Sequence, residues 1–180
     1  MNDYTKKAKC LTEPERKAIN EFIEKVVGNA DPTQIVMFGS ALYKEKHSDV
    51  DLAVLLDKEL KCDPYTGERN FVDIRGNIPS GYMYEAFGGK TEDLELAGIL
   101  MENKLKLNGA KIHYLTIEKE RADNLLEDLR RNCYHNEFQK ESLAISGAKP
   151  KLLFEVFLGA ILEDGLVLYK RPKKKDTQGD

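Results

Sequence analysis

Residues Ile35 to Asp57 read IVMFGSALYKEKHSDVDLAVLLD, and this stretch decides the expected fold. Four apolar residues lead into Gly39-Ser40, a connector of eight residues follows, and Asp49 and Asp51 then alternate with apolar residues. On a strand, side chains two residues apart point to the same face, with their Cα atoms roughly 6.6 Å apart. The pattern therefore predicts two apolar strands, with a pair of neighbouring carboxylates at the start of the second.

The paired carboxylates indicate a metal site. Two carboxylates held so close repel each other unless a cation lies between them. Mg²⁺ removes this cost, because it prefers carboxylate oxygens and keeps coordination positions free for phosphate oxygens. Gly39 permits a close backbone approach, and Ser40 offers a hydroxyl and an N–H to a phosphate. The stretch therefore predicts a pocket for a triphosphate and a metal ion.

Composition limits the other possibilities. The chain has 180 residues, of which 41% are hydrophobic and 33% charged, as expected for a globular protein with a core of its own. The formal net charge of −3 gives no general indication of a nucleic-acid partner, which stays open. Three widely spaced cysteines (Cys10, Cys62 and Cys133) argue against a disulfide framework or a zinc knuckle. With a polar start and no apolar run of membrane-spanning length, we expect a cytoplasmic protein without a membrane partner.

Helices and strands are expected to interleave along the chain. Thr12-Glu13-Pro14-Glu15 has the spacing of a capping box, and apolar residues at helical spacing follow as far as Gly28. We expect helices at about 13–27, 92–107, 117–131 and 151–162, with a helical turn at 41–46. Strands are expected at 34–38, 49–56, 111–116 and 166–169, and a strand-like piece at 71–74.

These elements predict an α/β (α+β) domain with a small mixed sheet flanked by helices. We expect one domain over residues 1–170, with a long insertion at 58–90 and a basic, disordered tail at 171–180. The insertion contains Tyr65, Tyr82, Tyr84 and Phe87, which either form a small satellite core or serve as a lid that stacks on a base.

Residues Phe38 to Leu52 resemble the signature of the DNA polymerase beta-type nucleotidyltransferase superfamily: an apolar strand, Gly-Ser, a short connector and Asp-x-Asp on the next strand. The order of elements from Gln34 to Thr116 is similar to that of the minimal nucleotidyltransferases, including the antitoxin-like branch. The resemblance implies transfer of a nucleoside monophosphate onto an acceptor hydroxyl, either AMP from ATP or another nucleotide from its triphosphate, with Mg²⁺ as cofactor. It assigns the triphosphate to Gly39 and Ser40, and the metal to Asp49 and Asp51.

Two departures from the family pattern affect this assignment. The third carboxylate is not evident, because His113 stands where it is expected; His113 or Asp73 is left to complete the catalytic set. Many minimal members have an arginine directly after Gly-Ser, whereas this chain has Ala41, which leaves Lys44 or Lys46, with Ser48, as further nucleotide-binding candidates. Both departures leave open a relative that binds without catalysis.

Three kinds of acceptor or partner are compatible with the resemblance. The first is a helical partner protein, as in toxin–antitoxin pairs, and the second is a small molecule held by the 58–90 insertion, as in antibiotic-modifying enzymes. The third is a non-catalytic binding module, in which the apolar helices hold a partner or a second copy of the chain.

Overall fold

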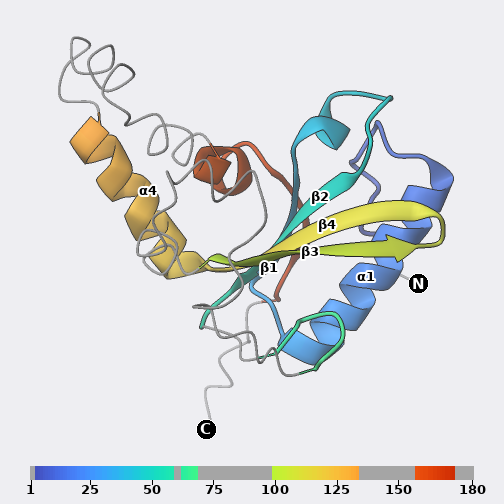
Figure 1. Ribbon diagram of the computed structural model, residues 1–180, viewed down its shortest axis with the longest axis horizontal. Coiled ribbons are helices and arrows are strands. Elements are labelled where there is room, and N and C mark those ends of the chain that lie inside the picture. Colours follow the sequence, from blue (N-terminus) through green and yellow to red (C-terminus); the bar gives the residue numbers. More distant parts are fainter. Residues whose placement is uncertain (1–2, 59–61, 69–98, 134–156, 173–180) are drawn as a thin grey trace, which may run out of the picture.

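The computed structural model describes residues 3–58, 62–68, 99–133 and 157–172, which build a five-stranded mixed sheet with helices (Figure 1). The strands are β1 (Gln34–Phe38), β2 (Val50–Leu56), β3 (Ile99–Leu107), β4 (Ala110–Glu118) and β5 (Leu166–Lys170). Their order across the sheet is β3-β4-β2-β1-β5. Only β2 and β4 pair in parallel, and the other neighbours are antiparallel. This arrangement confirms the predicted fold class.

Helix α1 (Glu13–Ala30) begins with the predicted capping box, in which the Thr12 N–H donates to Oε2 of Glu15 at 2.8 Å. It ends where Asp31 adopts a left-handed conformation with φ 44°. The other helical elements are the short 3₁₀ helix η1 (Ser40–Leu42), α4 (Lys119–Cys133) and a helical segment at 157–162. None of the helices in the described ranges is long and apolar enough to cross a membrane.

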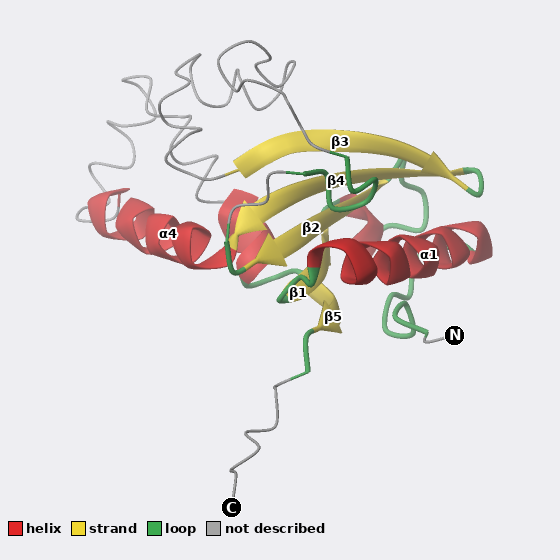
Figure 2. Ribbon diagram, turned by 90° about the horizontal axis from the view of Figure 1, so that it is seen from below, coloured by secondary structure: helices red, strands yellow, loops and turns green. Residues whose placement is uncertain are grey.

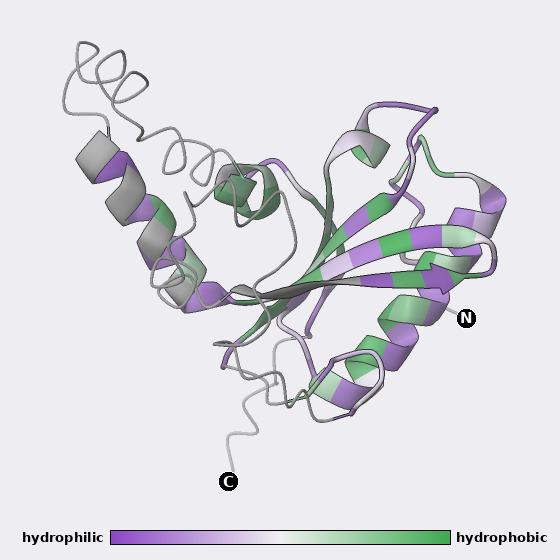
Figure 3. Cartoon of the chain, in the orientation of Figure 1, coloured by the Kyte–Doolittle hydropathy of each residue, from purple (hydrophilic) through white to green (hydrophobic). Residues whose placement is uncertain are grey.

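The sheet has an apolar core on each of its two faces. Strand side chains alternate between the faces, so that Leu52 and Ile112 join the cluster that contains α1, whereas Leu55 and Leu115 join the cluster that contains α4. Figure 3 shows the corresponding alternation of hydrophobic and hydrophilic residues along the strands. Helices α1 and α4 lie toward opposite ends of the sheet (Figure 2). The largest completely buried side chains of α1 are Ile19, Phe22 and Ile23.

The predicted helix at 92–107 is wrong over its described part, because residues 99–107 form strand β3. Asn108 and Gly109 have φ angles of 51° and 85° and connect Leu107 to its partner Ala110. Two residues with positive φ are the geometry of a tight hairpin turn, for which Asn-Gly is the preferred sequence. Asn-Gly is also compatible with a helix end, but it is a stronger indication of a hairpin.

Several expectations can be placed only in part. Strand 34–38 has its predicted bounds, and the strand expected at 111–116 extends over Ala110–Glu118. Of the helix expected at 151–162, only residues 157–162 are described, and they are helical. The strand-like piece at 71–74, most of the insertion and the tail from residue 173 lie outside the described residues.

The segment 62–68 is docked against α1 and β4. Tyr65 is buried and stacks on Phe22, with ring centroids 5.5 Å apart. The hydroxyl of Tyr114 donates to Oδ2 of the buried Asp63 at 2.8 Å. Of the two roles considered for the aromatic residues of the insertion, Tyr65 therefore has the core role, while Tyr82, Tyr84 and Phe87 lie outside the described residues.

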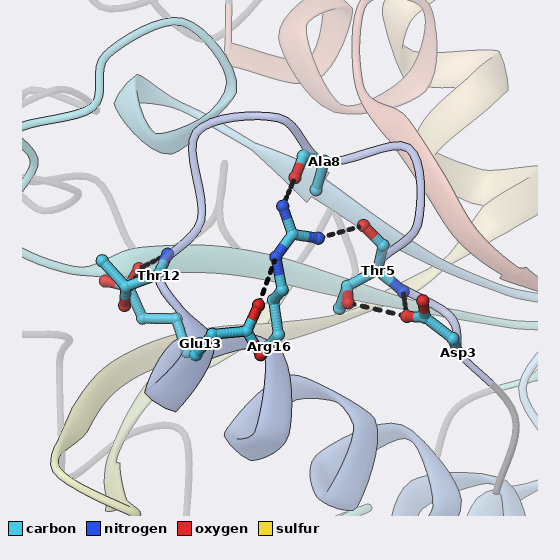
Figure 4. A network of polar contacts seen from close by, with 7 residues as sticks. Asp3, Thr5, Ala8, Thr12, Glu13 and Arg16 are labelled. Atoms are coloured by element: carbon cyan, nitrogen blue, oxygen red, sulfur yellow. Dashed lines mark hydrogen bonds and ion pairs between the residues drawn. The ribbon is translucent and has the colours of Figure 1, made fainter.

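The N-terminal segment is fastened to α1 by Arg16 (Figure 4) and by Asn20, whose Oδ1 accepts a hydrogen bond from the N–H of Tyr4 at 3.0 Å. The guanidinium of Arg16 donates to the carbonyl oxygens of Thr5, at 2.8 Å, and Ala8, at 2.5 Å. Asp3 accepts hydrogen bonds from the N–H and the hydroxyl of Thr5. These contacts hold the chain that leads into the capping box.

Candidate active site

Asp49, Asp51 and His113 form one cluster of potential metal ligands. One donor atom from each lies within 4.8 Å of the others. Nδ1 of His113 is 3.7 Å from Oδ2 of Asp49 and 3.9 Å from Oδ1 of Asp51. The three side chains are 21–25% exposed, so the cluster is partly shielded but open to a ligand.

The pairing of two parallel strands brings these residues together. Asp51 on β2 is the direct partner of His113 on β4, and Val50 is the partner of Ile112. Val50, Leu52, Ile112 and Tyr114 point into the α1 core, so Asp51 and His113 point to the other face. The two aspartates lie on one face beside each other, as the Asp-x-Asp pattern predicted.

Gly39 brings the turn after β1 into contact with the cluster. Its φ is 76°, a conformation that residues other than glycine rarely adopt. A Cβ at this position would overlap Oδ2 of Asp51 and would lie 3.3 Å from its Cγ. Because Phe38 is the direct partner of Asp51, the turn begins beside the carboxylates. The predicted Gly-Ser turn and the Asp-x-Asp pair are therefore neighbours in space.

A buried histidine fixes the connector between the turn and the aspartates. Nε2 of His47 lies 3.0 Å from Oε1 of Glu15 on α1, and its Nδ1 lies 2.8 Å from the carbonyl oxygen of Lys44. The His47 side chain is only 1% exposed. The side chain is therefore held between α1 and the connector backbone and is shielded from solvent.

Glu15 has a second role besides capping α1. Burial opposes ionisation of this carboxyl, but hydrogen bonds from the Thr12 backbone and hydroxyl, together with the nearby His47 ring, lower its pKa below 4.5. The sequence identified Glu15 as a capping residue, but it contained no indication of the contact with His47, 32 residues away.

The other predicted site residues lie in the turn after β1 and on the connector, except for Asp73. Ser40 is half-buried at the start of η1, where its carbonyl oxygen accepts hydrogen bonds from the N–H groups of Tyr43 and Lys44. Lys44, Lys46 and Ser48 are exposed on the connector. Asp73 lies outside the described residues.

The donor set fits a divalent cation. Ligands about 2.1 Å from an ion lie about 3.0–3.4 Å from one another. The separations of 3.7 and 3.9 Å are therefore close to what shared coordination needs. The two carboxylates suit Mg²⁺, whereas an imidazole nitrogen is better suited to a transition ion such as Mn²⁺ or Zn²⁺.

The family model of the nucleotidyltransferase domain matches residues 16–140, which include the turn, the connector and all three cluster residues. The chain belongs to the nucleotidyltransferase domain family. Comparisons with curated proteins and with solved structures found no match. Membership implies a nucleotide substrate and supports transfer of a nucleotidyl group as the general reaction of this nucleotidyltransferase.

Proposed function

We propose that this nucleotidyltransferase moves a nucleoside monophosphate, AMP from ATP, onto an acceptor hydroxyl in a reaction that depends on a divalent metal ion. The observation that carries the proposal is the contact between the Gly39 turn and the Asp49–Asp51–His113 cluster. It joins a backbone bend suited to phosphate oxygens with ligands suited to a cation.

Each residue of the site has a proposed role. Asp49 and Asp51 would hold the ion, for which Mg²⁺ is the family expectation, while Gly39 and Ser40, with Lys44 or Ser48 as additional contacts, would hold the triphosphate. A bound divalent ion would lower the pKa of the attacking hydroxyl and offset the charge of the departing pyrophosphate. His113 is either a third ligand or the group that accepts the proton of the hydroxyl, and Asp73 is the other candidate for completing the set.

The family resemblance offers a helical partner protein, by analogy with toxin–antitoxin pairs, as the first candidate for the acceptor. This analogy rests on the family resemblance. The charged residues on the sheet beside the cluster, described in the next subsection, provide a test of it. A small-molecule acceptor remains the second candidate, and a non-catalytic binding module, or a face that joins two copies of the chain, is the third. We propose the cytoplasm as the compartment, in agreement with the free thiols of Cys10 and Cys62.

Labelled nucleoside triphosphates, incubated with the protein, divalent ions and cell lysate, test the proposed reaction. Label should move to an acceptor with the wild-type chain. It should fail to move with Asp51→Asn, because a neutral amide oxygen binds a divalent ion far more weakly than a carboxylate does. Asp164→Asn is the matched control, since Asp164 is an exposed acid next to β5 that lies outside the cluster.

The outcome distinguishes catalysis from binding. Equal labelling of the acceptor by the wild type and by Asp51→Asn would show that the cluster takes no part in the reaction. Nucleotide-independent association with a partner, together with no transfer of label by the wild type, would favour the binding module.

A further inference from the structure

Three lysines share the sheet face of the cluster. Lys104 on β3 is the direct partner of His113, and Lys106 on β3 is the direct partner of Lys111 on β4. Direct partners on neighbouring strands lie on one face, and so do residues two apart along a strand. Lys104, Lys106 and Lys111 therefore lie on the face of His113 and Asp51, and we call these three residues the lysine strip.

Burial supports this assignment of faces. The residues that alternate with the lysine strip, among them Leu105, Ala110 and Ile112, pack into the α1 core on the opposite face. All three lysines are exposed. Within the described part of the chain, no ion pair involves any of them, although the chain as a whole carries a net charge of −3.

The strip carries an unfavourable arrangement of charge. Lys106 and Lys111 face each other directly, and like charges at such positions destabilise a sheet. The tip of the hairpin that carries them contacts α1, where the side-chain amide of Asn108 donates to Oε2 of Glu21 at 2.9 Å. A pair of cations opposed across two paired strands favours an anionic ligand, which would relieve the repulsion.

The order of strands places the strip on one side of the cluster. The Gly39 turn follows β1, Asp49 directly precedes β2 and Asp51 lies on it. His113 lies on β4, and the lysines lie on β3 and β4, so the order across the sheet is turn, acids, histidine, lysines. If the turn holds the triphosphate of the donor, the lysine strip lies on the opposite side, where the acceptor must approach.

We infer that the lysine strip binds the phosphate groups of a phosphate-bearing acceptor. Neighbouring strands are about 4.8 Å apart, so Lys104 is one strand away from His113 and two from Asp51. An acceptor held there by its phosphates would present its hydroxyl toward the cluster. This inference rests on the proposed function, and it names the chemistry of the acceptor: a nucleic-acid strand fits it, whereas an unphosphorylated protein does not.

Two binding measurements test the inference. One follows the fluorescence anisotropy of a labelled single-stranded oligonucleotide over a range of salt concentrations, and the other follows binding of a non-hydrolysable nucleoside triphosphate with a divalent ion. The test variant is Lys104→Gln/Lys106→Gln/Lys111→Gln. The control has the same change of charge at exposed lysines elsewhere, namely Lys17 on α1, Lys58 after β2 and Lys170 at the end of β5.

The test variant should bind the oligonucleotide about tenfold or more weakly, and the slope of log affinity against log salt should fall by about 1 for each phosphate that is no longer neutralised by a lysine. The control variant should keep the wild-type affinity and slope, and nucleotide binding should be the same in all three proteins. Nucleotide binding reports on the proposed function separately. If Asp51→Asn loses nucleotide binding while the test variant keeps the wild-type affinity for the oligonucleotide, the proposed function stands and the inference about the lysine strip is overturned.

The other outcomes are equally decisive. Weaker nucleotide binding by the test variant would assign the lysines to the donor triphosphate and overturn their role at the acceptor. Equal oligonucleotide binding by all proteins, with aggregation confined to the test variant, would mean that the lysines only protect the edge of the sheet from pairing with other chains. Transfer of label to an unphosphorylated protein by the test variant at the wild-type rate would also contradict the inference.

Discussion

Gly39 is the residue at which backbone conformation and site chemistry meet. Its positive φ and its contact with Asp51 are separate requirements, and each of them excludes a side chain. With φ 76° and ψ −159°, Gly39 occupies a backbone region that is essentially restricted to glycine, where another residue pays roughly 1–3 kcal/mol. The contact adds steric repulsion between a side chain at position 39 and Asp51, a residue of the cluster. A change at position 39 therefore acts on stability and on the cluster together.

Replacing Gly39 with alanine should destabilise the protein by about 1–3 kcal/mol or more and weaken metal binding, because the new Cβ displaces the carboxylate of Asp51. Chemical denaturation and calorimetric metal titration measure the two effects. Gly28→Ala is the control, since nothing lies within 4 Å of a Cβ at that helical position. It should stabilise α1 by about 0.5–1 kcal/mol. Unchanged metal binding in Gly39→Ala would contradict the proposed contact.

His113 should determine which metal ion the cluster prefers. The wild-type set of two carboxylates and an imidazole should bind Mn²⁺ more tightly than Mg²⁺, and His113→Asp should shift the preference toward Mg²⁺ by about tenfold, because it offers a third carboxylate. Competition titrations measure the shift, and imidazole nitrogen modulation in the electron spin echo of bound Mn²⁺ reports direct ligation. If the preference is the same in both proteins and no modulation is seen, His113 is not a ligand and its role as proton acceptor is favoured.

The elements around the site show what a local pattern can and cannot predict. Strand β1 and the Asp-x-Asp start of β2 follow from apolar runs and period-two alternation. The error at β3 arose because Leu94, Leu96, Ile99 and Leu100 fit helical spacing, while Lys104 to Leu107 alternate as on a strand. The pairing of β2 with β4 depends on contacts between distant parts of the chain, so the position of His113 beside Asp51 could be expected only from the family resemblance.

The connector depends on ionised Glu15. Its pKa is lowered in the folded protein, so its contribution to stability is present above its ordinary pKa of 4.5 and is lost as the pH falls through the lowered value. Glu15→Gln should cost about 1 kcal/mol near neutral pH, and the difference from wild type should shrink in acid. Denaturation curves between about pH 3 and about pH 7 measure this. Glu13→Gln, at an exposed position of the same helical turn, should show a smaller and flatter difference; equal curves for both variants would contradict the role of Glu15.

At the scale of the whole molecule, the segment 62–68 joins α1 to β4 through polar contacts within an apolar core. Asp63 accepts hydrogen bonds from the N–H groups of Tyr65 and Thr66 and from the hydroxyl of Tyr114, which is 51 residues away in the chain. Burial, with the hydrogen bond to Asp63, raises the pKa of Tyr114 well above 10.0. The contact between Asp63 and Tyr114 was not predictable from the sequence, because no local pattern links residues that are 51 positions apart.

Tyr114→Phe should destabilise the protein by about 1–3 kcal/mol, because it leaves a buried carboxylate oxygen without its donor. Because the pKa of Tyr114 is raised on folding, wild-type stability should fall as the pH rises above about 10, and the variant should lose less over that range. Denaturation at neutral and alkaline pH measures both effects. Tyr43→Phe, at a 73% exposed position, is the control and should match the wild type; a Tyr114→Phe variant as stable as this control would show that the hydrogen bond contributes nothing.

The close approach of position 39 to position 51 has a consequence for how this protein can vary. The steric obstacle to a side chain at 39 consists of the outer atoms of Asp51, whereas the Cβ of Asp51 would be at an ordinary distance of 3.6 Å. Shortening residue 51 to alanine would open space for a methyl group at 39, but only by giving up a carboxylate. Substitutions at the two positions are thus expected to be non-additive in stability, and lineages that retain the acid are confined to glycine at the bend.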